Sequence, residues 1–229
     1  MTPAAVARPI SIARALFPPW VEVDERDPRD VDAASALMPA EAEALGAVAP
    51  KRLREHAAGR LCAHAALGRL GARGAPLLND ADRIPRWPEG VVGTISHTRA
   101  WCVAAVARAS DTRAIGVDVE HETPLERRLW SHVLTDAERA VIERAPADER
   151  TRLAKLIFSA KECAYKCQYP LSRVFYGFHG MRIDVRVEDG RFDAVFLRDA
   201  APFRRGDRLE GGRFTAAHGV VVTALWLAA

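Results

Sequence analysis

Alanine, leucine, glutamate and arginine dominate residues 33–70, and this composition favours helices. Pro50 interrupts the stretch, so we predict one helix before it and a second in the run KRLREHAAGRLCAHAALGRL. A four-residue spacing in the second helix predicts a buried stripe of Leu53, Ala57, Leu61 and Ala65. The other sides form a basic face that is available to a ligand. This face carries Arg52, His56, Gly59 and Arg60.

Strand patterns follow in the middle and at the end of the chain. Residues 71–90 are rich in Gly, Pro, Asn and Asp and predict a long loop, after which VVGTISH and WCVAAVAR predict two strands. The polar stretch ASDTR is suited to a hairpin turn that joins WCVAAVAR to AIGVDVE. Three further strands are predicted near the carboxyl end: MRIDVRVED, RFDAVFLRD and VVVTALWL.

Helical patterns return after Glu120. The run LTDAERAVIERA places a threonine cap ahead of acids, and a longer helix is predicted from about 148 to 167. Each half of the chain thus mixes helices with antiparallel-type strands, which is an α+β pattern. AIGVDVE lies near the join of the two halves.

Composition narrows the classes of function. Among 229 residues, 49% are apolar and 28% charged, as in soluble globular proteins. The net charge of +3 is too small to predict a nucleic-acid partner. Neither the amino-terminal residues nor the run VVVTALWLAA resembles a signal peptide or a membrane span. Four cysteines without a CxxC pair indicate reduced thiols and a cytoplasmic setting.

GVDVE, residues 116–120, puts two acids two positions apart in a predicted strand. Because strand side chains alternate, the apolar residues point one way, and Gly116, Asp118 and Glu120 point the other way. The two carboxylates then lie about 7 Å apart on one surface. This is typical of a solvated strand face. It also suits Mg²⁺, which binds through one or two carboxylates together with substrate phosphate.

FSAKECAYK, residues 158–166, predicts part of an amphipathic helix. Its apolar stripe is formed by Leu153, Leu156, Ile157, Ala160 and Ala164. The opposite face carries Lys155, Ser159, Glu162 and Lys166. The simplest interpretation of Glu162 and Lys166 is an exposed ion pair worth about 0.3–0.5 kcal/mol. The other is a functional pair in one site.

His97 ends the strand in TISHT, where a histidine is either structural or a donor to a phosphate. Together, these segments resemble the 4′-phosphopantetheinyl transferase superfamily, whose hallmarks are a G-[IV]-D-x-E strand and a [WF]-S-x-K-E-x-x-x-K helix. Both hallmarks are present, about forty residues apart. KRLREHAAGR and PRWPEGVVGTISH resemble the branch that contains the enterobactin synthase component D-like enzymes. The resemblance covers roughly residues 50–170. The residues that depart from the usual pattern stand at packing positions: His56, Thr94 and Phe158.

The resemblance implies that the chain transfers the 4′-phosphopantetheine arm of coenzyme A to a serine of an apo acyl or peptidyl carrier protein, releasing adenosine 3′,5′-bisphosphate. Mg²⁺, or Mn²⁺ in its place, would be held by Asp118, Glu120 and Glu162. The implied catalytic groups are Glu162, Lys166 and Asp118, with Glu162 the candidate general base. The coenzyme would be bound by Arg52, Arg60, Ser96, His97, Lys161 and Lys166.

The same resemblance implies two similar, pseudo-symmetric α+β halves, residues 1–118 and 119–229, with the active site in the cleft between them. Carriers of nonribosomal peptide synthases, siderophore pathways or polyketide synthases are the expected partners, and a monomer is expected. A docking patch, or else ordinary core, is predicted in CQYPLSRVFYG from Tyr169, Leu171, Val174 and Phe175. The competing functions are a non-catalytic coenzyme A or nucleotide-binding module and a Mg²⁺-dependent phosphohydrolase.

Overall fold

The computed structural model describes residues 11–72 and 74–229 and confirms the α+β fold. The helices are α1 (Ala33–Ala36), α2 (Pro39–Leu45), α3 (Pro50–Arg69), α4 (Trp130–Val133), α5 (Asp136–Arg144) and α6 (Arg150–Ser172). The strands are β1 (Glu22–Arg26), β2 (Val91–His97), β3 (Cys102–Arg108), β4 (Thr112–His121), β5 (Met181–Arg186), β6 (Arg191–Phe196), β7 (Arg208–Ala217) and β8 (Val220–Ala228). Short 3-10 helices include η4 (Phe178–Gly180).

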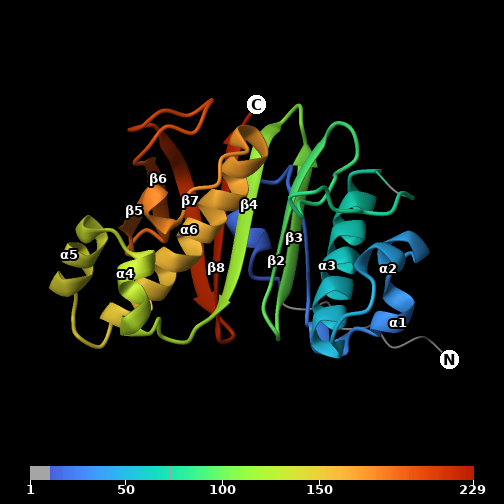
Figure 1. Ribbon diagram of the computed structural model, residues 1–229, viewed down its shortest axis with the longest axis horizontal. Coiled ribbons are helices and arrows are strands. Elements are labelled where there is room, and N and C mark those ends of the chain that lie inside the picture. Colours follow the sequence, from blue (N-terminus) through green and yellow to red (C-terminus); the bar gives the residue numbers. More distant parts are fainter. Residues whose placement is uncertain (1–10, 73) are drawn as a thin grey trace.

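Two antiparallel sheets divide the molecule. The first has the strand order β1-β3-β2 and the second has the order β4-β8-β7-β6-β5. Figure 1 shows the halves side by side, with α3 beside the first sheet and α6 beside the second. All of β4 pairs with β8, so the expected boundary at residues 118/119 falls inside a single strand.

The edges of the two sheets, β2 and β4, meet in the middle of the molecule. Thr94 and Ser96 on β2 join them through their hydroxyl groups. The backbone N–H of Val117 donates to Thr94 Oγ1 at 3.3 Å, and that of Val119 donates to Ser96 Oγ at 3.2 Å. Side-chain hydroxyls thus satisfy buried amides of an edge strand, which would otherwise be left unpaired. Thr94, expected only to pack, has a polar role here.

Gly116 lets α6 lie directly against β4. A Cβ atom at this position would come within 2.2 Å of the carbonyl oxygen of Cys163 and 3.0 Å of the backbone nitrogen of Cys167. The predicted alternation of β4 is confirmed, because Ile115, Val117 and Val119 lie in a core shared with β3, β8 and residues 12–23. The opposite face, with Gly116 and Asp118, is therefore free to contact α6.

The predicted hairpin between residues 101–108 and 114–120 is wrong. β3 pairs with β1 and β2, whereas β4 pairs with β8, more than a hundred residues later. The polar stretch is a turn at which the chain passes from one sheet to the other. Short sequence spacing favours a hairpin, but the nine-residue strand β8 offers β4 a longer partner than the seven-residue β3.

The helical predictions need two corrections in the first half. The region before Pro50 forms two helices, because Met38 precedes Pro39 and is extended, with φ −65° and ψ 149°. In α3 the buried face is rotated toward small residues that approach β3 closely. Of the predicted stripe only Ala57 is buried. The remaining buried apolar residues are Ala58, Cys62, Ala63, Ala66 and Leu67.

In the second half, α5 has the predicted threonine cap, with Thr135 Oγ1 accepting from the backbone N–H of Glu138. The long helix α6 extends beyond the predicted end to Ser172. β1 and β7 were not predicted: β1 reads EVDER and β7 contains two adjacent glycines, so neither has a plain strand pattern.

Cys62, Cys102, Cys163 and Cys167 are buried free thiols. Within the described ranges, no helix has the length and apolarity needed to span a bilayer.

Candidate active site

Asp118 lies where the two halves meet and is almost completely buried, with 3% of the residue exposed. Three side chains hold its carboxylate. Ser96 Oγ of β2 donates to Oδ1 at 3.0 Å, and Ser159 Oγ of α6 donates to Oδ2 at 2.9 Å. Lys166 Nζ donates to Oδ1 at 2.6 Å. A buried carboxylate is stable only with such partners, so the position of Asp118 is fixed from both sides.

Lys166 does not form an exposed pair with Glu162, because its ammonium contacts Asp118 and also Ser96 Oγ at 2.9 Å. Burial alone would lower the pKa of Lys166, but the adjacent Asp118 carboxylate more than offsets this, and the pKa is raised. Lys166 is therefore charged at neutral pH. Ser96 is buried and serves as a bridge between Lys166, Asp118 and the backbone of β4.

Glu120, two residues along β4, is paired with a lysine of its own. Lys155 Nζ lies 2.9 Å from Glu120 Oε2, and the two side chains are 12% and 28% exposed. The interpretation of GVDVE as an entirely solvated strand face is therefore wrong for Asp118 and holds only partly for Glu120. The face is covered by one side of α6.

Glu162 adjoins both acids from α6. Its pKa is raised above the ordinary value because it is largely buried; Lys166 opposes this shift, while the nearby charges of Asp118 and Glu120 add to it. No hydrogen bond or ion pair to its carboxylate occurs among residues 11–72 and 74–229. Glu162 is the least constrained of the three acids and the best placed to take a proton.

A cavity of about 220 Å³ adjoins Glu162. Its walls are mainly aromatic and come from α6 and the segment after it: Tyr165, Phe175, Tyr176, Phe178 and Met181. The hydroxyl of Tyr176 is buried and has no hydrogen-bond partner in the described part of the chain. The cavity can take an apolar or amide-bearing chain beside the candidate base.

The three acids supply the hard oxygen donors that Mg²⁺ prefers. In the described ranges, however, no three His, Cys, Asp or Glu side chains are grouped as a ready metal site. Lys166 and Lys155 neutralise Asp118 and Glu120 instead. The chemistry of the donors fits a divalent cation, which would compete with these ammonium groups for carboxylate oxygens.

A basic surface faces the acids from the first half. Arg52 Nη1 lies 3.1 Å from His97 Nε2, and because a guanidinium can only donate, Nε2 is the acceptor. The proton of the ring is then on Nδ1, which lies 3.8 Å from a Glu55 carboxylate oxygen. Burial lowers the pKa of His97, and Arg52 adds to this, although Glu55 opposes it. His97 is thus neutral at pH 7 and orients Arg52.

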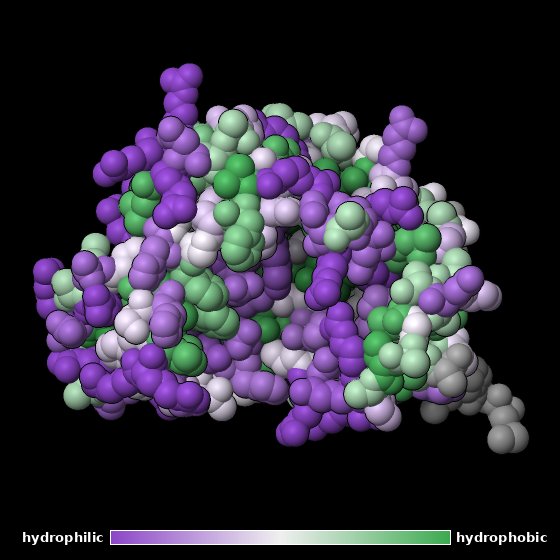
Figure 2. Space-filling model, viewed as in Figure 1, coloured by the Kyte–Doolittle hydropathy of each residue, from purple (hydrophilic) through white to green (hydrophobic). Residues whose placement is uncertain are grey.

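Arg60 lies deeper on the same helix, with 5% of the residue exposed. Its Nη2 donates to Asn79 Oδ1 at 2.7 Å, while its buried Nε has no partner in the described part of the chain. Next to it, burial lowers the pKa of His56 to about 4, with Arg60 and Arg52 adding to the shift. The face therefore carries arginine charge and neutral imidazoles. Figure 2 shows a hollow between the two halves on this side, with hydrophilic residues along it.

Comparison with known proteins identifies the family. The model of the 4′-phosphopantetheinyl transferase N-terminal domain matches residues 40–107, and that of the 4′-phosphopantetheinyl transferase superfamily matches residues 114–215. The 4′-phosphopantetheinyl transferase Svp of Streptomyces mobaraensis is 39% identical over 220 residues, which cover 94% of this chain and 89% of that protein. The chain belongs to the 4′-phosphopantetheinyl transferase superfamily.

Two further relatives place this transferase within the superfamily. The 4′-phosphopantetheinyl transferase PptT of Mycobacterium tuberculosis is 32% identical over 202 residues, covering 83% of this chain and 86% of that protein. Enterobactin synthase component D of Escherichia coli is 36% identical over 118 residues, covering 51% of this chain and 54% of that protein. The expected resemblance to component D is confirmed, and the resemblance to Svp extends over far more of the chain.

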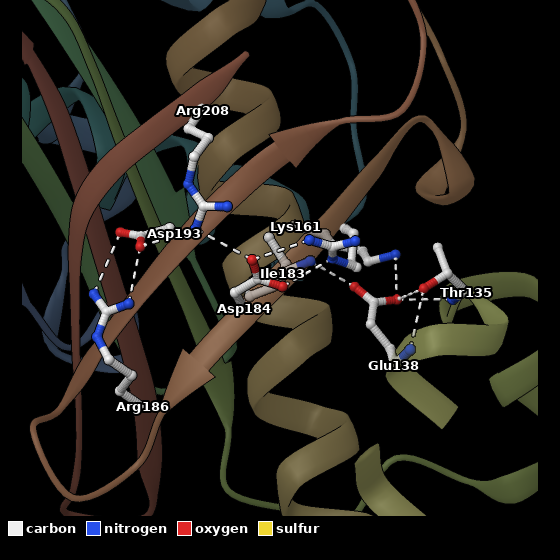
Figure 3. A network of polar contacts seen from close by, with 9 residues as sticks. Thr135, Glu138, Lys161, Ile183, Asp184, Arg186, Asp193 and Arg208 are labelled. Atoms are coloured by element: carbon white, nitrogen blue, oxygen red, sulfur yellow. Dashed lines mark hydrogen bonds and ion pairs between the residues drawn. The ribbon is translucent and has the colours of Figure 1, made fainter. Parts of the chain in front are cut away.

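The ammonium of Lys161 in this transferase is bound by groups other than the three acids, and its expected place among the coenzyme ligands stays a prediction. Its ammonium is 2.8 Å from Glu138 Oε2 and donates to the carbonyl oxygens of Val133 and Phe178 at 2.8 and 2.7 Å. Figure 3 shows Lys161, Glu138 and Thr135 pointing toward one another. All three ammonium protons have partners, and the side chain is 3% exposed. Lys161 thus positions the segment at Phe178, which lines the cavity beside Glu162.

The predicted docking segment of the transferase is only partly a surface. Residues 167–172 are the end of α6, and Leu171 and Val174 pack against the core. Phe175 is 78% exposed and is the strongest candidate for contact with a partner. No sequence pattern indicates a role for Lys155 or Tyr176, because the partner of Lys155 lies 35 residues away and the cavity beside Tyr176 is formed only in the fold.

Proposed function

We propose that this transferase moves the 4′-phosphopantetheine arm of coenzyme A to a serine hydroxyl of an apo carrier protein and releases adenosine 3′,5′-bisphosphate. The observation that carries the proposal is the junction at Asp118. There the acids of β4 and α6, the ammonium of Lys166 and a cavity adjoin the arginine face of the other half.

The carrier serine must lose its proton as it attacks the phosphorus atom. Glu162 is the proposed base, because burial raises its pKa above the ordinary value and so makes its carboxylate more basic, and because the residue lines the cavity. Lys166 is the proposed donor to the phosphate on which charge develops. Asp118, held by Ser96 and Ser159, keeps the Lys166 ammonium in place.

The diphosphate of coenzyme A is strongly anionic, so phosphoryl transfer depends on positioning and charge neutralisation. Mg²⁺, or Mn²⁺, when bound by Asp118, Glu120 and Glu162, would neutralise that charge. We propose that Arg52, Arg60 and His97 bind the coenzyme's phosphates from α3 and β2. The buried Nε of Arg60, which lacks a partner in the described ranges, supports this assignment. Ser96 and Lys161 are assigned to positioning instead.

Carrier domains of nonribosomal peptide or polyketide synthases are the proposed partners. The relative from Escherichia coli is named as an enterobactin synthase component, which supports siderophore synthesis as one such pathway. The exposed Phe175 beside the cavity supports docking of the carrier at this end of α6. The monomeric state and the cytoplasmic setting remain predictions.

One assay separates transfer from its alternatives. The protein is incubated with coenzyme A, Mg²⁺ and an apo peptidyl carrier domain, and intact carrier mass and nucleotide products are measured together. A carrier that gains one phosphopantetheine arm, with equimolar adenosine 3′,5′-bisphosphate, supports transfer. Cleavage of coenzyme A without a gain in carrier mass would indicate a phosphohydrolase. Tight coenzyme binding without cleavage, with every carrier tried, would indicate a binding module.

A further inference from the structure

A short hairpin of residues 78–86, in the loop after α3, connects the two halves in addition to the contact between β2 and β4. The backbone N–H of Asp80 donates to the carbonyl oxygen of Ile84 at 2.8 Å. Asp80 Oδ1 closes the turn by accepting from the backbone N–H groups of Asp82 and Ile84, both at 2.9 Å. The 78–86 hairpin is therefore a compact unit, and a contact at its tip fixes its base as well.

Arg173, from the other half, contacts the tip of the 78–86 hairpin. Its Nη1 lies 2.8 Å from Asp80 Oδ2 and 3.3 Å from Asp82 Oδ2, across more than ninety residues of sequence. The guanidinium also lies 5.9 Å from the centroid of the Tyr169 ring on α6. The hydrogen bond from Arg173 lowers the pKa of Asp80, so this pair is charged at neutral pH. Asp80 thus uses one carboxylate oxygen within the hairpin and the other between the two halves.

The backbone conformation at Arg173 also draws attention to this contact. α6 ends there with φ 53° and ψ 18°, which is the left-handed conformation. Helices that end in this way usually have glycine at that position, because a side chain there costs stability. Such residues cluster at functional sites. Here the residue in this conformation is the one whose side chain reaches the other half, so we interpret the contact as functional.

The base of the 78–86 hairpin contacts Arg60 of α3. Asn79 directly precedes Asp80, and its Oδ1 accepts from Arg60 Nη2 at 2.7 Å. Asn79 also forms a β-bridge with Pro85, so its position depends on the closed hairpin. In the proposed function, Arg60 binds a phosphate of the coenzyme. A chain of contacts therefore runs from Arg173 through Asp80 and Asn79 to a phosphate ligand in the first half.

We propose that Arg173 is a positioning residue for coenzyme A: it fixes the 78–86 hairpin from the second half and so holds Asn79 and Arg60 in place before the coenzyme arrives. The inference rests on the proposed function, because it takes Arg60 as a phosphate ligand. Without the contact from Arg173, coenzyme A has to order the hairpin as it binds, and the entropy lost in that ordering lowers the affinity. The effect is moderate, since an exposed ion pair changes an equilibrium constant by about fivefold at most.

The test is the Kd of coenzyme A, measured by calorimetric titration at fixed Mg²⁺ without a carrier. We expect Arg173→Met to raise the Kd about fivefold at low salt. The ratio of the two Kd values should fall toward one at about 1 M NaCl, because salt screens exposed charges. Arg173→Lys should bind nearly as the wild type does, because one nitrogen, Nη1, makes both carboxylate contacts and an ammonium can replace it. Arg128→Met is the matched control, since Arg128 is an exposed arginine that pairs with Glu126 of its own half at 2.6 Å.

Asp80→Asn tests the same contact from the hairpin. Asparagine keeps an oxygen that can accept from the backbone N–H groups of Asp82 and Ile84, but it removes the charge that Arg173 binds. Asp80→Asn should therefore weaken coenzyme A binding as well. The double variant Arg173→Met/Asp80→Asn should bind no more weakly than Arg173→Met alone, because both changes remove one interaction.

A wild-type Kd in Arg173→Met would overturn the proposal, as would an equal loss of affinity in Arg128→Met or a loss that does not change with salt. Arg60→Lys distinguishes these results from a failure of the proposed function. Weaker binding in Arg60→Lys together with unchanged binding in Arg173→Met would remove Arg173 and leave the phosphate site in place. Unchanged binding in Arg60→Lys would overturn the phosphate site on which the proposal rests.

Discussion

Replacing Gly116 with alanine should separate α6 from β4 and thereby disable the site. The added Cβ would lie 2.2 Å from the carbonyl oxygen of Cys163, whereas ordinary contacts begin at 3.4 Å, so the helix and strand must move apart by about 1.2 Å. The obstacle is backbone and cannot change rotamer. Overpacking of this kind costs about 1–3 kcal/mol of stability.

The same shift changes the position of Glu162 relative to Asp118, and a misplacement of about 1 Å can reduce a rate by about 100-fold. Urea denaturation measures the first effect, and the kcat/KM of carrier modification measures the second. Gly177→Ala is the control for stability, because a Cβ there meets nothing within 4 Å and the residue has φ −58°. A Gly116→Ala variant with wild-type stability and rate would refute the argument that this contact sets the geometry of the site.

Three further outcomes are expected. In metal-free buffer the raised pKa of Glu162 means that the folded chain holds this proton more tightly than the unfolded chain, so stability falls as pH rises from about 4.5 through the raised pKa. Glu162→Gln cannot ionise and so avoids this loss of stability, and it should raise the urea midpoint at pH 8. A lower urea midpoint than that of the wild type would contradict this expectation. Glu138→Ala leaves Lys161 charged and buried, which should lower the free energy of unfolding by about 3–5 kcal/mol. The double variant Glu138→Leu/Lys161→Met should lose clearly less free energy of unfolding than the sum of the losses in the two single variants. Arg60→Lys should weaken coenzyme A binding at least tenfold in calorimetric titration, because lysine cannot reproduce the guanidinium fork; unchanged affinity would remove Arg60 from the proposed phosphate site.

The sequence predicted the residues of the site where charged side chains recur with the period of a strand or a helix. Alternation along β4 predicted that Asp118 and Glu120 share a face, and helical periodicity predicted that Glu162 and Lys166 share another. Their meeting depends on Gly116, whose role is visible only when α6 is placed on the strand. Motif spacing therefore predicted the members of the site without its geometry.

Pairings between distant segments could not be predicted in this way. β4 joins β8 because of apolar complementarity across the chain, so the hairpin expected from the short ASDTR turn was wrong. Lys161 belongs to a hallmark motif and carries a charge suited to phosphate, yet its ammonium is paired with Glu138 of α5. Burial of a charged side chain is decided by partners that local pattern does not reveal.

In the proposed function, the acids at the junction of β4 and α6 carry out arm transfer to a carrier serine. The most direct test is the initial rate of carrier modification, followed by intact mass, for the wild type and for Glu162→Gln at saturating coenzyme A, Mg²⁺ and carrier. General-base contributions are about 10²–10⁴-fold, so we predict a rate loss of at least about 100-fold in a variant that still unfolds cooperatively. A folded Glu162→Gln protein that modifies the carrier at a rate close to that of the wild type would contradict the claim.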